Sequence, residues 1–438
     1  MRKAKNMYGV LEEKIDSKQA KICVLGMGYV GLPLGVALAA KNFFVYGFDT
    51  NSSRVDKLRK GEQYIIDIDS KDVLVLIKRK RFFPTTKEGV LKEADVIIIC
   101  VPTPLRRVKV PDISYVVKAS KMVGKNLRKG HLVILESTSY PGTTRDVLMP
   151  FLAKSGLKEG KDYFLCFSPE RVNPGDKKFP LTKIPKIVGG ISRQAGLLAK
   201  ELYGQIIDKV FLTANPEVAE TSKLLENTFR LVNIALANEF SIVCNKLGIS
   251  IWEVIEAAKT KPFGFMPFYP GPGVGGHCLP CDPLYLSWKA KKLGFKTKMI
   301  DLASYINHYM PGYVVERLRD LLARQSKNMK GKKILILGVT YKKNVKDLRE
   351  SSALDVIDQL LKEKAEVDYF DPLIPFLKIN GIDLKLIPLT RENLSKYDCA
   401  VVITDHSDIN YQFIRRHSRL IFDTRNIYKK DYNNVKKI

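Results

Sequence analysis

The segment 270–283, PGPGVGGHCLPCDP, places two cysteines and an acid in a loop rich in glycine and proline. Cys278 follows closely spaced glycines, which let a substrate approach the chain, and Asp282 follows four residues later, where a carboxylate can orient water or accept a proton. This pattern indicates a nucleophilic cysteine. Cys278 and Cys281 also form a C-x-x-C pair, which is typical of redox dithiols and of one half of a zinc site. The other cysteines and the histidines are scattered, so we predict no metal site, while the redox alternative stays open.

A polar stripe lies on the long helical stretch 217–247. Lys223 and Asn227 are four residues apart and therefore share a helix face, with Glu226 and Arg230 beside them. Such a stripe can serve a charged intermediate, or it can be an ordinary solvated face. Spacing alone does not distinguish these two interpretations.

Further polar residues follow the ends of predicted strands, where open α/β sheets bind their ligands. They are Ser137-Thr138, Ser168-Pro169-Glu170-Arg171, Asp347-Leu348-Arg349 and Asp423-Thr424-Arg425. Each is unremarkable by itself, but together they place basic side chains repeatedly where an anionic ligand can sit.

A dinucleotide signature opens the chain. Gly26-Met27-Gly28-Tyr29-Val30-Gly31 follows a predicted strand and begins a helix, so a pyrophosphate can approach the turn and face the helix N-terminus. Asp49, 18 residues beyond Gly31, ends the next strand and can accept from ribose hydroxyls. An acid there repels a 2′-phosphate and favours NAD over NADP, although Arg54 nearby weakens that preference. The alternative is that the glycines serve packing alone.

Hydrophobic periodicity shows the elements that must position these residues. Short apolar runs alternating with amphipathic helical stretches predict a parallel sheet covered on both faces, a helical middle region, and a smaller α/β domain. The predicted strands are 21–26, 43–49, 94–102, 131–138 and 184–190 in the first part and 332–341, 365–371, 399–405 and 419–425 in the last. The last domain keeps only Gly338 of the glycine signature, so we expect no second dinucleotide there.

Composition narrows the remaining classes. The chain has 438 residues, 45 % of them hydrophobic, and a formal charge of +27, which excludes a mainly disordered chain but allows polyanion binding. No cluster of basic and aromatic residues supports a nucleic-acid site. Seven scattered cysteines form no disulfide framework, the N-terminus lacks an apolar signal core, and no membrane span is seen. We therefore expect a soluble cytoplasmic protein.

The chain resembles the UDP-glucose/GDP-mannose dehydrogenase family over nearly its whole length. The matching strings are GMGYVGLPL (26–34), VPTPL (101–105), ESTSYPGTT (136–144), SPER (168–171), KLLENTFR (223–230), PGPGVGGHCLPCDP (270–283), TYKKNVKDLRES (340–351) and FDTRN (422–426). The resemblance implies two Rossmann-like, doubly wound α/β domains joined by a long central helix and a helical middle domain. It also implies domains at 1–213, 214–322 and 323–438, a homodimer, NAD on the first domain, and a nucleotide sugar as substrate.

The resemblance further implies an NAD-dependent, four-electron oxidation of a sugar C6 alcohol to the carboxylate, through a thiohemiacetal and a thioester on a cysteine. It makes Cys278 the nucleophile, Lys223 the acid/base or oxyanion partner, and Asn227 a further group that stabilises the oxyanion. Glu170, Thr138 and Asp282 then assist in proton transfer and hydrolysis. The cofactor positions it implies are Gly26, Gly28, Tyr29, Val30, Gly31, Asp49, Arg54, Thr103, Thr138 and Arg349. The substrate positions it implies are Arg171, Val172, Lys223, Asn227, Arg230, Gly275, Lys342 and Arg425.

Departures from the UDP-glucose branch refine the expected substrate. Pro174 stands where that branch has a second glutamate, and Cys281 stands where it has a lysine. The segment 260–273 is similar to UDP-N-acetylglucosamine and UDP-N-acetylgalactosamine 6-dehydrogenases, whereas Pro262 and Gly264 replace a basic pair of the mannosamine enzymes. We expect UDP-GlcNAc or UDP-GalNAc, with UDP-ManNAc or UDP-glucose as alternatives. From other classes, a non-catalytic NAD-binding or thiol-redox regulator and a nucleic-acid binder remain to be tested.

Overall fold

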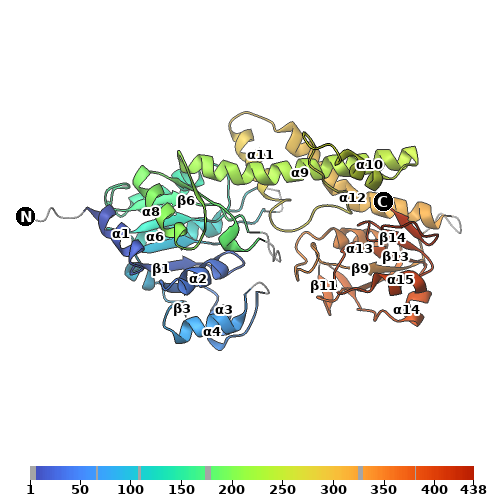
Figure 1. Ribbon diagram of the computed structural model, residues 1–438, viewed down its shortest axis with the longest axis horizontal. Helices are drawn as coiled ribbons and strands as arrows, with labels where there is room; N and C mark the ends of the chain where they lie inside the picture. The colour runs from blue at the N-terminus through green and yellow to red at the C-terminus, as the bar shows by residue number, and fades with distance from the viewer. Residues whose placement is uncertain (1–5, 66–67, 107–109, 173–178, 324–328, 380) are drawn as a thin grey trace, which may run out of the picture. The chain divides into compact units, whose positions relative to one another are not determined.

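A computed structural model describes the chain except residues 1–5, 66–67, 107–109, 173–178, 324–328 and 380. The chain forms two compact units, each with its own sheet (Figure 1). The first unit comprises Met1–Glu226 with Leu284–Phe295, and the second comprises Asn227–Pro283 with Lys296–Ile438. No helix in the described part is both long and apolar enough to cross a membrane.

The first unit is built on an eight-stranded sheet in the order β3-β2-β1-β4-β5-β6-β7-β8. Its strands are β1 Lys21–Leu25, β2 Phe44–Phe48, β3 Phe82–Thr85, β4 Val96–Ile99, β5 Leu132–Leu135, β6 Phe164–Phe167, β7 Lys186–Gly190 and β8 Val210–Thr213. The five strands predicted here are confirmed, whereas β3, β6 and β8 were not foreseen.

The sheet departs from the predicted parallel arrangement at one step, where β7 runs antiparallel to β6, with Cys166 opposite Gly190. A parallel neighbour needs a long crossover, usually a helix. In the described part of the β6–β7 connection the regular structure is a single 3₁₀ turn, η2, at Leu181–Lys183.

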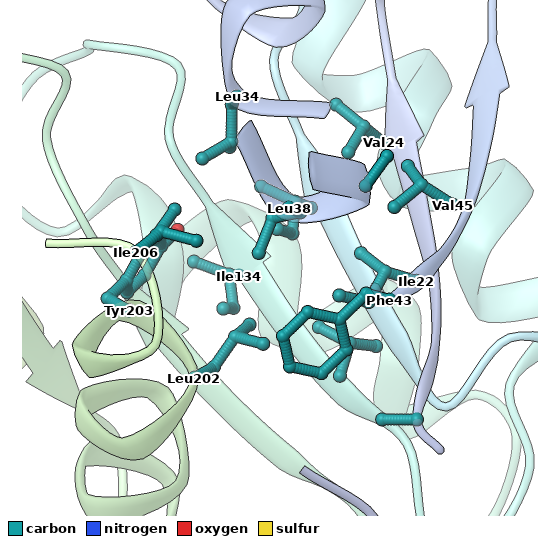
Figure 2. Close-up of a cluster of buried hydrophobic side chains, with 14 of the residues drawn as sticks. Ile22, Val24, Leu34, Leu38, Phe43, Val45, Ile134, Leu202, Tyr203 and Ile206 are labelled. Carbon is teal, nitrogen blue, oxygen red and sulfur yellow. The ribbon is translucent and has the colours of Figure 1, made fainter. Parts of the chain in front are cut away.

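Helices cover both faces of this sheet. They are α1 Met7–Asp16, α2 Gly31–Ala40, α3 Ser52–Lys60, α4 Ser70–Lys78, α5 Val90–Glu93, α6 Ser114–Asn126, the π-helical turn η1 Thr143–Leu148, α7 Met149–Ala153, α8 Arg193–Gly204 and α11 Asp282–Lys292. Alternate strand residues point to opposite faces. Figure 2 shows one of the two resulting cores, in which Ile22, Val24 and Val45 of the strands meet Leu38 of α2 and Leu202 of α8. On the other face Cys23, Leu25 and Val133 belong to a second core with residues of α6.

Helix α9, Pro216–Leu247, is the long helix expected from the uninterrupted periodicity. Its residues up to Glu226 belong to the first unit and those from Asn227 onwards to the second. It therefore supplies polar side chains to the functional regions of both units.

The second unit contains a five-stranded parallel sheet in the order β10-β9-β13-β14-β15 and a separate antiparallel pair, β11-β12. Its strands are β9 Lys333–Leu337, β10 Glu366–Phe370, β11 Leu377–Ile379, β12 Ile382–Leu384, β13 Cys399–Val402, β14 Ile421–Asp423 and β15 Val435–Lys437. Its helices, besides α9, are α10 Ile251–Ala258, α12 Lys298–Leu322, α13 Ser352–Lys362, α14 Arg391–Lys396 and α15 Tyr411–His417. The four predicted strands are confirmed, and with them the α/β, helical, α/β organisation.

Candidate active site

The glycine-rich turn between β1 and α2 is shaped by two kinds of constraint. Gly26 has a φ of +99°, and a Cβ there would lie 2.4 Å from the carbonyl oxygen of Cys100. A Cβ at Gly31 would lie 1.9 Å from the carbonyl oxygen of Gly26. These two glycines are therefore required by packing. A Cβ at Gly28, by contrast, would have no atom within 4 Å, so this glycine leaves open space at the start of α2. A close approach of a pyrophosphate explains a glycine at that position.

Asp49 anchors this turn from the end of β2. It is buried, its Oδ2 accepts from the backbone N–H of Met27 at 2.8 Å, and its Oδ1 accepts from that of Asn51 at 2.9 Å. Arg54 forms an ion pair with Oδ2 at 2.7 Å. Tyr64, which the sequence did not single out, donates to the carbonyl of Met27 at 2.8 Å. The turn, the helix N-terminus and the acid together fit a dinucleotide such as NAD.

The other cofactor positions predicted in the first unit follow the carboxyl ends of strands of the same sheet. Val30 is the N-terminal flanking residue of α2, and Tyr29 beside it is exposed. Thr103 is buried, and its carbonyl accepts from the hydroxyl of Tyr285. Thr138 is half-buried just after β5, where Ser137 donates to the carbonyl of Val101 at 2.8 Å.

Glu170, just after β6, is held at both oxygens. Its Oε1 accepts from the backbone N–H groups of Arg171 at 2.6 Å and Val172 at 2.5 Å, and its Oε2 lies 3.3 Å from Nζ of Lys186. Burial opposes ionisation, but the charges of Lys186 and Lys223 and the two N–H donors hold the pKa of this carboxyl below its ordinary value. Glu170 is therefore available as a carboxylate, the form that a base requires.

Lys223 and Arg171 also lie in the first unit. Lys223 is buried on α9, and its charge acts on Glu170. The guanidinium of Arg171 pairs with Glu226 at 2.7 Å and donates to the carbonyl of Pro185 at 2.7 Å. The stripe predicted on this helix is thus buried at Lys223 and at Asn227, whereas Arg230 further along is exposed. A purely solvated face is excluded for the first two.

In the second unit, the cysteine loop ends at the start of α11. Cys278 is exposed, whereas the other six cysteines are buried. The carbonyl of Cys278 accepts from the N–H groups of Cys281 at 3.1 Å and Asp282 at 2.8 Å, which closes a tight turn. Oδ2 of Asp282 accepts from the side-chain amide of Asn227 at 2.5 Å. Cys278 and Asp282 thus lie in one short stretch, and the amide of Asn227 on α9 holds the carboxylate of Asp282.

Cys281 differs from Cys278 in its surroundings. It is buried, and burial together with the charge of Asp282 raises the pKa of its thiol to about 12. A thiol with that pKa is almost wholly protonated at neutral pH and reacts slowly. This environment favours one reactive cysteine over an active dithiol.

The glycines of the same loop press against the segment that contains Lys342 and Arg349. A Cβ at Gly275 would lie 2.3 Å from the carbonyl oxygen of Glu350, and Gly276, with a φ of +89°, packs against the ring of Tyr341. The N–H of Gly276 donates to the carbonyl of Arg349 at 3.0 Å. The side chain of Arg349 pairs with Asp347 at 2.7 Å. The structure therefore brings Gly275 together with this basic segment.

Arg425 reaches the loop from the end of β14. Its Nε donates to the carbonyl of Ile403 at 2.7 Å, and a Cβ at Gly271 would lie 2.7 Å from its Nη1. Burial lowers the pKa of Arg425, while Asp405 and Asp423 oppose that shift. A half-buried guanidinium beside a glycine loop is suited to an anionic group of a substrate.

The second unit contains a variant of the dinucleotide turn. Gly338 has a φ of +79°, and Asp371 after β10 accepts from the N–H of Val339 at 2.7 Å, as Asp49 does from Met27. Here, however, His406 lies 3.0 Å from Oδ2 of Asp371 and 3.0 Å from the hydroxyl of Thr340, and it is buried. These contacts occupy the acid with protein side chains and favour the expectation of no second dinucleotide.

Two networks contain residues that the sequence did not single out. In the first unit, Lys186 pairs with both Glu170 and Glu136, and Glu136 also accepts from the hydroxyl of Tyr203. In the second, Asn238 of α9 donates to Asn307 of α12 at 2.8 Å and accepts from the N–H of Gly271 at 2.9 Å. Of the residues in these two networks, the sequence contained a signal only for Lys186, a lysine inside an otherwise apolar predicted strand.

Pro174, used above to separate the substrate branches, lies outside the described residues.

Comparisons with known proteins agree along the chain. Three models of the UDP-glucose/GDP-mannose dehydrogenase family match it: the NAD binding domain at 20–207, the central domain at 217–309 and the UDP binding domain at 335–430. The chain is 39 % identical over 391 residues to a UDP-N-acetyl-D-glucosamine 6-dehydrogenase of Salmonella typhi, covering 89 % of this chain and 90 % of that protein.

A second relative bears a different substrate name. The chain is 38 % identical to a UDP-N-acetyl-D-mannosamine dehydrogenase of Pyrococcus horikoshii, covering 93 % of this chain and 96 % of that one. The solved structure of a UDP-D-ManNAc dehydrogenase from Pyrococcus horikoshii matches with a TM-score of 0.86 at 34 % identity, over 95 % of this chain and 99 % of that chain.

Proposed function

The chain belongs to the UDP-glucose/GDP-mannose dehydrogenase family, and we propose that it oxidises the C6 hydroxyl of a UDP-N-acetylhexosamine to the carboxylate with NAD. The observation that carries this proposal is the setting of Cys278. It is an exposed thiol next to the Asn227–Asp282 hydrogen bond, in a loop packed on the basic segment around Lys342. An oxidation that stops at an aldehyde needs no thiol, whereas oxidation to the acid benefits from a covalent thioester.

The proposed reaction passes through a covalent adduct on Cys278. The thiolate of Cys278 adds to the C6 aldehyde and forms a carbon–sulfur bond, and the resulting oxyanion takes up a proton to give a thiohemiacetal. NAD bound at the glycine-rich turn would supply the hydride acceptor for both oxidations, with one NAD molecule consumed in each. After the second, Cys278 holds the sugar as a thioester. Attack by water on that carbonyl breaks the carbon–sulfur bond and releases the acid and the thiol.

Polar residues in each unit have surroundings that suit them to these steps. The side-chain amide of Asn227 has one N–H on Asp282 and a second that can donate to an oxyanion. Asp282 and Glu170 are carboxylates suited to accept protons, and Lys223 is a buried cation suited to stabilise a developing negative charge or to exchange a proton. Thr138 assists at the end of β5.

For the sugar, we favour UDP-GlcNAc or UDP-GalNAc, with UDP-ManNAc as the alternative. The support is the segment 260–273, in which Pro262 and Gly264 stand in place of a basic pair. The relatives bear both glucosamine and mannosamine names, so an assay must separate them.

The test is an NADH-coupled screen of UDP-GlcNAc, UDP-GalNAc, UDP-ManNAc, UDP-glucose and GDP-mannose. We expect two NADH per UDP-GlcNAc or UDP-GalNAc consumed and a uronic acid as product. One NADH per sugar with an aldehyde as the final product would contradict the thioester route. Turnover of UDP-ManNAc alone would show that UDP-ManNAc, the alternative, is the substrate.

We also propose the domain limits 1–213, 214–322 and 323–438, and a homodimer formed through the helical region. Apolar side chains are exposed on α9 at Leu236 and Phe240 and on α12 at Leu302 and Tyr305, which is typical of a buried contact between copies. Light scattering should give twice the chain mass of 49.6 kDa. A Phe240→Glu variant that remains dimeric would argue against this surface.

A further inference from the structure

A buried lysine, Lys186, lies between two carboxylates, those of Glu136 and Glu170. Lys186 opens β7, and its side chain is 3 % exposed. Its Nζ lies 3.0 Å from Oε1 of Glu136 and 3.3 Å from Oε2 of Glu170. Glu136, just after β5, is fully buried and also accepts from the hydroxyl of Tyr203 on α8. Three strand ends and one helix therefore converge on a single ammonium group.

Glu170 depends on this ammonium at one of its oxygens. The backbone N–H groups of Arg171 and Val172 both donate to Oε1. Among the described residues, it is Lys186 that donates to Oε2. The ammonium also lies 5.1 Å from the ring centroid of Tyr203, and Cys100 lies on the far side of Glu136. Since a buried carboxylate without a cation tends to take up a proton, the position of Lys186 favours the ionised form of Glu170.

We propose that Lys186 is a positioning residue that keeps Glu170 ionised and oriented as a base, with Glu136 and Tyr203 holding the ammonium in place. This inference rests on the proposed function, in which Glu170 takes a proton during oxidation or thioester hydrolysis. When Glu170 becomes a carboxylic acid, Lys186 stays charged and remains paired with Glu136. The cluster thus tolerates both states of the base without a change in the charge of the lysine.

The charges that face these groups agree with this assignment. Around Glu170 they are Lys186 and Lys223, and around Lys186 they are Glu136 and Glu170. Burial lowers the pKa of Lys186, but the two carboxylates outweigh it and raise the pKa overall. Burial and the charge of Glu170 raise the pKa of Glu136, although Lys186 opposes this. Lys186 is therefore the shared counter-charge of both carboxylates.

The test compares variants that should move the ionisation of Glu170 in opposite directions. Lys186→Met with Glu136→Gln removes the cation and one of its two counter-charges together, so the net charge of the cluster is unchanged. We expect the acid limb of the kcat–pH profile to rise by about one pH unit or more, with KM changed less than about threefold. Glu136→Gln alone leaves the lysine to Glu170, so its acid limb should stay in place or fall. An acid limb that is unmoved in the double variant, or that rises equally in both variants, overturns the proposal.

A direct measurement separates this inference from the proposed function. In pH-difference infrared spectra, the carboxylic acid band of Glu170 is assigned by its loss in Glu170→Gln. We expect this band to appear at higher pH in the double variant than in the wild type, and an unchanged midpoint overturns the inference. A wild-type protein that oxidises none of the sugar nucleotides refutes the proposed function, while the infrared titration still decides the role of Lys186.

Discussion

Asn227 donates its side-chain amide to Asp282 at 2.5 Å, which ties α9 to the first residue of α11, four residues after Cys278. Both side chains are buried. This hydrogen bond fixes the carboxylate relative to the backbone turn of the cysteine loop, and the second N–H of the amide is the one that we propose donates to the oxyanion.

Replacement of Asp282 by Asn should remove a proton acceptor while keeping its size. We expect kcat to fall by about 100-fold or more, because general acid–base groups contribute about that factor. Steady-state NADH formation at saturating substrate measures this change. Asp320→Asn, on the exposed side of α12 where Asp320 pairs with Arg317 at 3.5 Å, is the matched control and should leave kcat unchanged. Equal losses in the two variants would show that Asp282 has no specific role.

Replacement of Cys278 by Ser should prevent release of the uronic acid, because an alkoxide adduct cannot form a thioester. We expect acid formation to fall at least about 100-fold, measured by chromatography of the products. Cys281→Ser is the control, since the buried thiol of Cys281 has a pKa of about 12 and is not placed as a nucleophile. A Cys281→Ser variant with strongly reduced turnover would revive the dithiol interpretation.

The glycine-rich turn allows a paired test at Gly28 and Gly31. A Cβ at Gly28 meets open space, so Gly28→Ala should keep the free energy of unfolding within about 0.5 kcal/mol and weaken NAD binding by about tenfold or more. A Cβ at Gly31 would lie 1.9 Å from a backbone oxygen, so Gly31→Ala should destabilise the protein strongly. Calorimetric titration with NAD and urea unfolding measure the two effects. Unchanged NAD affinity in Gly28→Ala would place the dinucleotide elsewhere.

Glu220 makes stability depend on pH. This buried carboxyl on α9 accepts from the N–H groups of Gly142 at 2.6 Å and Thr144 at 2.9 Å, but burial outweighs these donors and raises its pKa to about 7. Its folded pKa exceeds the unfolded value, so its contribution is present at low pH and is lost as the pH rises from about 4.5 to 7.

Glu220→Gln should remove this dependence. Between pH 5 and pH 8 we expect the wild type to lose roughly 2–3 kcal/mol of unfolding free energy relative to the variant. Urea unfolding of both proteins across this range measures the difference, and the other titrating groups cancel in the comparison. Parallel stability curves would show that Glu220 titrates alike in the folded and unfolded chain.

The sequence by itself determined the elements and residues that depend on local geometry. The strand at 21–26, the helix 217–247 and the turn at Gly26–Gly31 follow from periodicity and steric limits within a few residues, and the structure contains each of them. The loop at 270–283 was equally visible, because Cys278 and Asp282 lie four residues apart.

Tertiary structure decided what depends on contacts between distant segments. Lys186 meets Glu136 from 50 residues away in the chain, and Asn238 meets Asn307 across 69 residues. The antiparallel step between β6 and β7 belongs to the same class. Local preferences are fixed by the atoms of neighbouring residues, whereas these pairings depend on how whole strands and helices pack, and no short stretch of sequence contains that information.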